Sequence, residues 1–149
     1  MTTTTEQAAR TDRRNRFVPL TTRQIALVCL AGAALWLIAA LSLRALAPLG
    51  VYEGASRAIL YLGIAAVTWP TLVATWRLTG LRRDQIALGV AIGTAAATIL
   101  DGIALAWIPA LYGGETAYVA GAGAAILWGA GVGIVMACFM NRTPDADEG

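Results

Sequence analysis

Residues 94–109 read TAAATILDGIALAWIP and place one aspartate, Asp101, inside an otherwise apolar run. The length and composition of this run predict a membrane-spanning helix. An ionised side chain near the middle of a bilayer costs about 2.5–3.5 kcal/mol on insertion scales, so it needs a partner, a wet cavity or a proton. Asp101 is therefore the first candidate for a functional residue.

The whole chain has the composition of an integral membrane protein. Of its 149 residues, 58% are hydrophobic and 13% are charged, whereas a soluble domain carries about 25% charged residues. Its apolar blocks are long enough to cross a bilayer, for which a helix needs roughly 20 residues. We predict an all-α membrane protein, a four-helix transmembrane domain over residues 23–141 arranged as an up-down bundle, with spans at residues 24–47, 58–78, 85–108 and 117–140.

The charged residues predict the orientation of this bundle. Residues 1–22 form a basic segment without apolar periodicity, which predicts a disordered tail, and residues 142–149 form an acidic tail. All but two of the 11 basic residues, Arg44 and Arg57, fall on the side of the two termini. Because arginine is enriched in cytoplasmic segments, both termini are expected in the cytoplasm.

A weak internal similarity relates the first and third predicted spans. Gln24-Ile-Ala-Leu-x4-Gly32 matches Gln85-Ile-Ala-Leu-x4-Gly93, and the same offset aligns Pro48 with Pro109. These spans would run in the same direction, so a true repeat would consist of two parallel hairpins. In a chain so rich in alanine, leucine and glycine, the sequence leaves duplication and chance similarity open.

Small residues recur every fourth position in two spans and predict close helix packing. The third span contains Gly89, Gly93 and Ala97, and the fourth contains Gly121, Ala125, Gly129 and Gly133. Asp101 continues the row in the third span, so its carboxylate is expected at a helix contact. Thr98 lies on roughly the same face.

Two partners are expected for the Asp101 carboxylate. Asp101 and Arg44 are placed about 6 Å and about 13 Å outward of the bilayer centre by the helical rise, and an arginine side chain can reach inward. An Arg44–Asp101 ion pair is therefore one structural hypothesis, with Tyr61 as a further hydrogen-bond donor. The functional alternative is that Asp101 exchanges a proton or holds a cationic substrate.

Three tryptophans, Trp36, Trp69 and Trp128, fall near the predicted midplane on different helices. They could line a pocket for an apolar ligand or a cation. Packing of bulky side chains against glycine-rich faces explains them as well, so both interpretations stay open.

Residues 100–112, LDGIALAWIPALY, followed by ILWG at 126–129, resemble a family of small bacterial four-pass membrane proteins grouped as a domain of unknown function. The resemblance covers roughly residues 23–141. It implies a four-helix fold in the bacterial inner membrane and makes Asp101, Pro109 and Trp128 features of the family. It implies no activity.

Function is predicted at the level of class only. The chain lacks histidine, and no paired nucleophile and base, metal-ligand cluster or cofactor motif is visible, so we expect no catalytic residue, metal or cofactor. The first hypothesis is a non-enzymatic accessory or assembly subunit. It would act in the lipid bilayer, as a homo-oligomer or within a larger membrane complex, without nucleic acid. The alternative is a minimal transporter or ligand-binding protein that uses Asp101.

Overall fold

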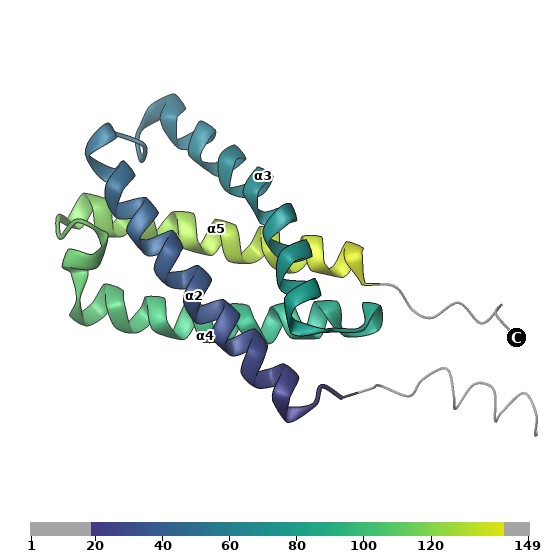
Figure 1. The fold of residues 1–149 in the computed structure, drawn as a ribbon. Helices are drawn as coiled ribbons and strands as arrows, with labels where there is room; N and C mark the ends of the chain where they lie inside the picture. Colours follow the sequence, from purple (N-terminus) through teal and green to yellow (C-terminus); the bar gives the residue numbers. More distant parts are fainter. Residues whose placement is uncertain (1–18, 142–149) are drawn as a thin grey trace, which may run out of the picture.

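The computed structural model describes residues 19–141 of the chain. Within them the backbone forms four long helices joined by short connections (Figure 1). The helices are α2 (Thr22–Leu46), α3 (Gly54–Thr79), α4 (Ile86–Trp107) and α5 (Thr116–Met140), and single 3-10 turns occupy η1 (Ala47–Leu49), η2 (Arg83–Gln85) and η3 (Pro109–Tyr112). The predicted tails lie outside the described residues, except for positions 19–22 of the first tail. Helix α2 begins at Thr22, the last of these positions.

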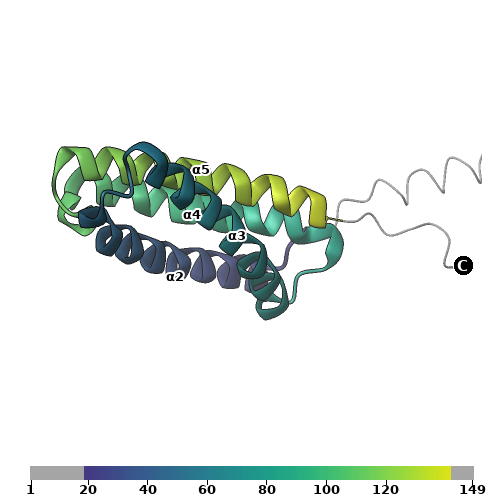
Figure 2. The same ribbon diagram turned by 90° about the horizontal axis from the view of Figure 1, so that it is seen from above.

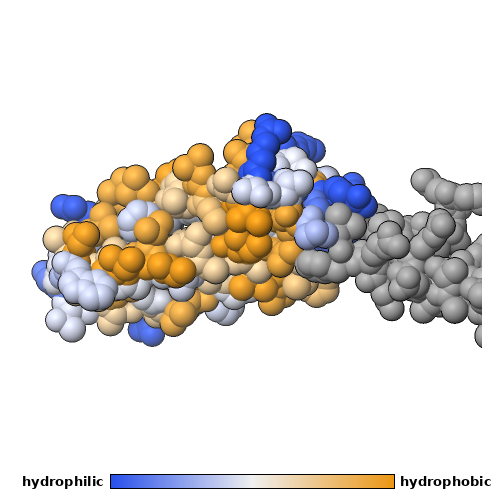
Figure 3. All heavy atoms as spheres, turned by 90° about the horizontal axis from the view of Figure 1, so that it is seen from below, coloured by the Kyte–Doolittle hydropathy of each residue, from blue (hydrophilic) through white to orange (hydrophobic). Residues whose placement is uncertain are grey.

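The prediction of an all-α protein with four candidate spans is confirmed. All four helices are long and apolar enough to cross a membrane. The chain passes back and forth between the same two ends of the molecule, with α2 and α3 inclined to α4 and α5 (Figure 1 and Figure 2). On the face shown in Figure 3, apolar residues cover the middle while most hydrophilic residues gather toward the two ends. We call the end that contains Thr22 and Met140 the terminal end, and the end that contains η1 and η3 the loop end.

The second helix begins earlier than expected. The predicted second span starts at residue 58, which leaves residues 54–57 in a connection. In the structure they form the first turn of α3, which starts after Glu53 in an extended conformation. Helix α3 packs mainly on α5 and touches α2 only slightly, and it lies apart from α2 in Figure 1.

The two hairpins, α2–α3 and α4–α5, meet through reciprocal hydrogen bonds at the terminal end. The Gln24 side-chain amide donates to the Gly80 carbonyl oxygen at 3.0 Å, and the Gln85 amide donates to the Pro19 carbonyl oxygen at 3.3 Å. Gln24 and Gln85 are 61 residues apart and bond each other at 3.3 Å. Pro19 and Gly80 have the same separation, so the similarity in sequence corresponds to an equivalence in space.

Helices α2 and α4 form the most extensive contact and cross where the repeated glycines meet. A Cβ atom on Gly32 would collide with the carbonyl oxygen of Gly93, and one on Gly93 would lie 2.9 Å from the carbonyl oxygen of Val28. Real Cβ atoms essentially never come so close to a backbone. Glycine at both positions therefore permits the backbone contact on which the bundle is built.

Candidate functional site

The carboxylate of Asp101 lies inside the bundle, where Tyr112 reaches it from η3. Helix α4 ends at Trp107, and the turn that begins at Pro109 brings the chain back over the loop end. Tyr112 is fully buried and Asp101 is 7% exposed. The Tyr112 hydroxyl donates to Oδ1 of Asp101, so the loop that follows α4 is bonded to the interior of that helix.

A second hydrogen bond extends this contact to α2. The indole Nε1 of Trp36 donates to the Tyr112 hydroxyl oxygen at 3.2 Å. The Trp36–Tyr112–Asp101 network therefore joins α2, η3 and α4. Among residues 19–141, every buried side-chain nitrogen and oxygen has a hydrogen-bond partner, as expected of a polar network in an apolar interior.

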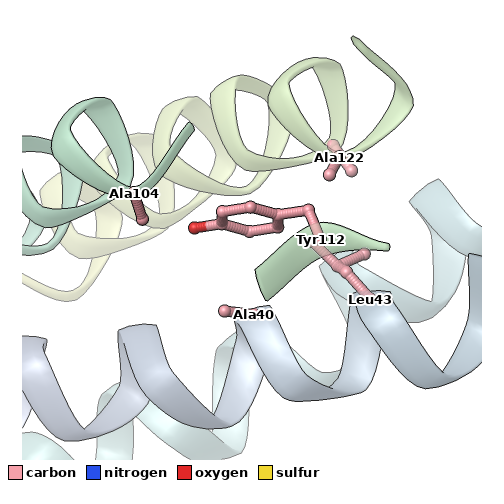
Figure 4. Packing of buried hydrophobic residues seen from close by; sticks show 6 residues of the cluster. Ala40, Leu43, Ala104, Tyr112 and Ala122 are labelled. Atoms are coloured by element: carbon pink, nitrogen blue, oxygen red, sulfur yellow. The ribbon is translucent and has the colours of Figure 1, made fainter. Parts of the chain in front are cut away.

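Small side chains make room for the tyrosine ring. Figure 4 shows the ring between Ala40 of α2, Ala104 of α4 and Ala122 of α5, with Leu43 near its base. All four of these residues are buried. Burial in this cluster is the main cause that raises the pKa of the Tyr112 phenol, and its hydrogen bond to Asp101 raises it further. Tyr112 is therefore held in its protonated, donating form.

The expected ion pair between Arg44 and Asp101 is wrong for this structure. Arg44 is exposed on α2, because Leu43 and Ala47 occupy the buried face of this segment. In the described part of the chain the ion pair is instead between Arg82 Nε and Asp84 Oδ1, at 3.1 Å.

Two further residues expected beside Asp101 lie elsewhere. The ring of Tyr61 stacks on Trp128 with centroids 5.4 Å apart, and the Trp128 indole donates to the Tyr61 carbonyl oxygen at 3.1 Å. Thr98 is exposed, and its hydroxyl donates to the Thr94 carbonyl oxygen within α4. Tyr112, not Tyr61, is the tyrosine that bonds the carboxylate.

The three midplane tryptophans do not converge on one pocket. Trp36 is bonded to Tyr112, Trp128 contacts Tyr61, and Trp69 is 50% exposed on α3. Each tryptophan therefore has different surroundings, and none of them lines either of the two cavities described below.

The small-residue rows pack against segments of the same chain. A Cβ on Gly121 would collide with Tyr52, one on Gly129 would lie 3.3 Å from Ile64, and one on Gly133 would lie 3.8 Å from Thr68. These contacts place the three glycines against α3 and the connection before it, and Ala125 of the same row is buried in the cluster around Tyr112. In α4, Gly89 faces the side chain of Leu81, Gly93 faces α2, and Ala97 is half-buried.

The larger cavity, of about 280 Å³, lies at the loop end. Tyr52, Glu53, Arg57 and Tyr118 are among its lining residues, and Arg57 Nε donates to the Tyr52 carbonyl oxygen at 2.9 Å. Asp101 is not part of its wall. Residues 19–141 contain no group of three histidine, cysteine, aspartate or glutamate residues that could hold a metal ion.

Sequence reasoning missed the role of Tyr112. Its residue type and its place after a predicted span suggest the membrane interface, where tyrosine is common. The available signal was the turn: a tyrosine three residues after Pro109 can fold back onto the helix that the proline ends.

We find no match to this chain among protein-family models, curated proteins or solved structures. The resemblance of residues 100–129 to the four-pass family stays a prediction.

Proposed function

We propose that this chain is a non-enzymatic, multi-pass membrane protein that acts as a small assembly subunit, docking on another membrane helix through the outer face of α4. The partner helix belongs to a second copy of the chain or to a larger membrane complex. The observation that carries the proposal is a row of small residues on α4 that no other described helix covers: Thr98, Gly102 and Ala106 are exposed at intervals of four.

Gly102 marks the centre of this row. Among the described residues, no atom of a neighbouring segment lies within 4 Å of the place where its Cβ would be. Exposed Ile99 and Ile103 flank it, so a second backbone could approach between two ridges. In lipid, where apolar surface alone drives little association, close backbone approach of this kind supplies the packing energy.

The Asp101–Tyr112 hydrogen bond supports the proposal by fixing the rotation of α4. Asp101 points inward and its neighbour Gly102 points outward. The carboxylate acts on this account as a structural contact, and it stabilises the face that is presented to a partner.

The proposed environment is a bacterial inner membrane, with both termini in the cytoplasm. Four apolar helices and the arginine distribution support this placement. The terminal end then lies on the cytoplasmic side, and the loop end lies outside.

The docking face is tested by Gly102→Leu, with Gly131→Leu on α5 as the matched control. Gly131 is also exposed and also lacks neighbouring atoms within 4 Å of its Cβ position. Native mass spectrometry of complexes released from lipid nanodiscs is expected to show association of wild type and Gly131→Leu, and its loss for Gly102→Leu. A strictly monomeric wild type, or equal behaviour of the two variants, contradicts the proposal.

The buried carboxylate also favours a second candidate, a minimal transporter or ligand-binding protein in which Asp101 carries a proton or binds a cation. Neither described cavity includes Asp101 in its wall. Asp101→Asn keeps an oxygen that can accept from Tyr112 and removes the charge. In proteoliposomes, a charge-dependent transporter loses proton-coupled flux in this variant. Unchanged flux with intact folding rejects this candidate.

A further inference from the structure

A second cavity, of about 270 Å³, opens at the terminal end between the start of α2 and the end of α3. Arg23 and Arg77 both line it, together with Thr21 and Thr79, and no acidic residue does. The amide of Gln24 donates to the Gly80 carbonyl oxygen in the same wall, so this acceptor is already engaged.

The two arginines have no ion-pair partner among residues 19–141. Among the described residues the acidic side chain at this end is that of Asp84, and Arg82 engages it at 3.1 Å. Arg83 lies over the Trp76 ring, 5.2 Å from its centroid. Two arginines that line one cavity without a carboxylate in its described wall suit an anion, since each guanidinium can donate two hydrogen bonds to one oxyanion.

Apolar side chains also line the cavity. They belong to Leu27 and Leu78, and Leu78 is 82% exposed. A wall that combines two arginines with exposed apolar side chains fits a phosphate attached to an acyl chain. We propose that this cavity binds a phosphate-bearing anion through Arg23 and Arg77, taken from a lipid headgroup or from solution.

The lipid source rests on the membrane insertion proposed above, whereas binding of free phosphate does not. Neither source depends on docking through α4, so this inference and the assembly role can fail separately.

The test uses the full chain in an uncharged detergent, with native mass spectrometry to count bound ligand. The probes are phosphatidylglycerol, phosphatidylcholine and inorganic phosphate. The test variant is Arg23→Gln/Arg77→Gln. The matched control, Arg44→Gln/Arg57→Gln, removes the same charge from two exposed arginines at the loop end and leaves the arginines of residues 10–16 in place.

Wild type and the control are expected to bind phosphatidylglycerol about tenfold more tightly than Arg23→Gln/Arg77→Gln, because charged hydrogen bonds are lost only there. If inorganic phosphate does not compete, the ligand is a lipid; if it competes and binds alone, the ligand is a free phosphate. Equal loss in both double variants, or no loss in either, overturns the site. Should the glutamine variant fail to fold, Arg23→Lys/Arg77→Lys replaces it, and it must bind more weakly than wild type because lysine lacks the guanidinium fork.

Discussion

The Tyr112 hydroxyl donates a hydrogen bond to the carboxylate of Asp101, although the two residues lie on opposite sides of Pro109, which follows the end of α4. This hydrogen bond joins the turn η3, at the loop end of the bundle, to a buried residue of α4. It also gives the buried aspartate a neutral partner, where a cationic one was expected.

Tyr112→Phe removes one hydroxyl and leaves both Asp101 and Trp36 without their shared partner. The expected cost is about 1–3 kcal/mol of unfolding free energy, the usual penalty for a buried polar group left unsatisfied. Reversible unfolding in mixed detergent measures it. Tyr61→Phe is the control, and it is expected to be near neutral because the Tyr61 ring, not its hydroxyl, makes the described contacts. A larger cost for Tyr61→Phe would reinstate Tyr61 as the donor to Asp101.

The raised pKa of Tyr112 makes stability sensitive to alkaline pH. In the unfolded chain the phenol titrates at its ordinary pKa of 10.0, while burial keeps it protonated to higher pH in the folded chain. Its contribution to stability is therefore complete below pH 10.0 and is lost as the pH rises from there through the folded pKa.

Unfolding free energies measured on both sides of pH 10.0 check this dependence in wild type and Tyr112→Phe. The fall above pH 10.0 should be shallower in the variant. Both proteins keep Tyr52, whose pKa is also raised by burial, so the difference between the two curves isolates Tyr112. Parallel curves would show that Tyr112 titrates normally.

Gly93→Ala tests the crossing of α2 and α4. The added methyl would lie 2.9 Å from the Val28 carbonyl oxygen, and overpacking of this kind costs typically about 1–3 kcal/mol. The matched substitution, Gly102→Ala, meets open space within the chain and is expected to be neutral or to stabilise α4 by up to about 1 kcal/mol, since alanine is the better helix former. Thermal unfolding of both variants distinguishes them, and equal effects would contradict the backbone contact.

The helices could be predicted from the sequence because length and hydropathy alone determine which segments can span a membrane. The start of α3 could not be predicted from hydropathy, because the small and polar residues 54–57 carry no apolar signal. In the structure they form the first turn of the helix. The internal similarity was visible at Gln24 and Gln85. Their reciprocal hydrogen bonds could not be predicted, because the carbonyl groups that the two amides reach belong to Pro19 and Gly80 in other segments.

The candidate site was predicted only in part. Burial of Asp101 followed from the row of small residues that precedes it. The hydrogen-bond partner of Asp101 could not be predicted. Counting the helical rise places Arg44 near the depth of Asp101, but it does not give the rotation of α2 about its axis. The buried position of Tyr112 depends on the path of η3, which residue type alone does not specify.

A double-mutant cycle measures whether Asp101 is a structural contact of Tyr112. Unfolding free energies are measured for wild type, Asp101→Ala, Tyr112→Phe and the double variant in the same detergent. The expected result is a coupling energy of about 0.5–3 kcal/mol, because each single change removes the same hydrogen bond. Additive effects, with a coupling energy near zero, would contradict the account and return Asp101 to the role of an independent functional charge.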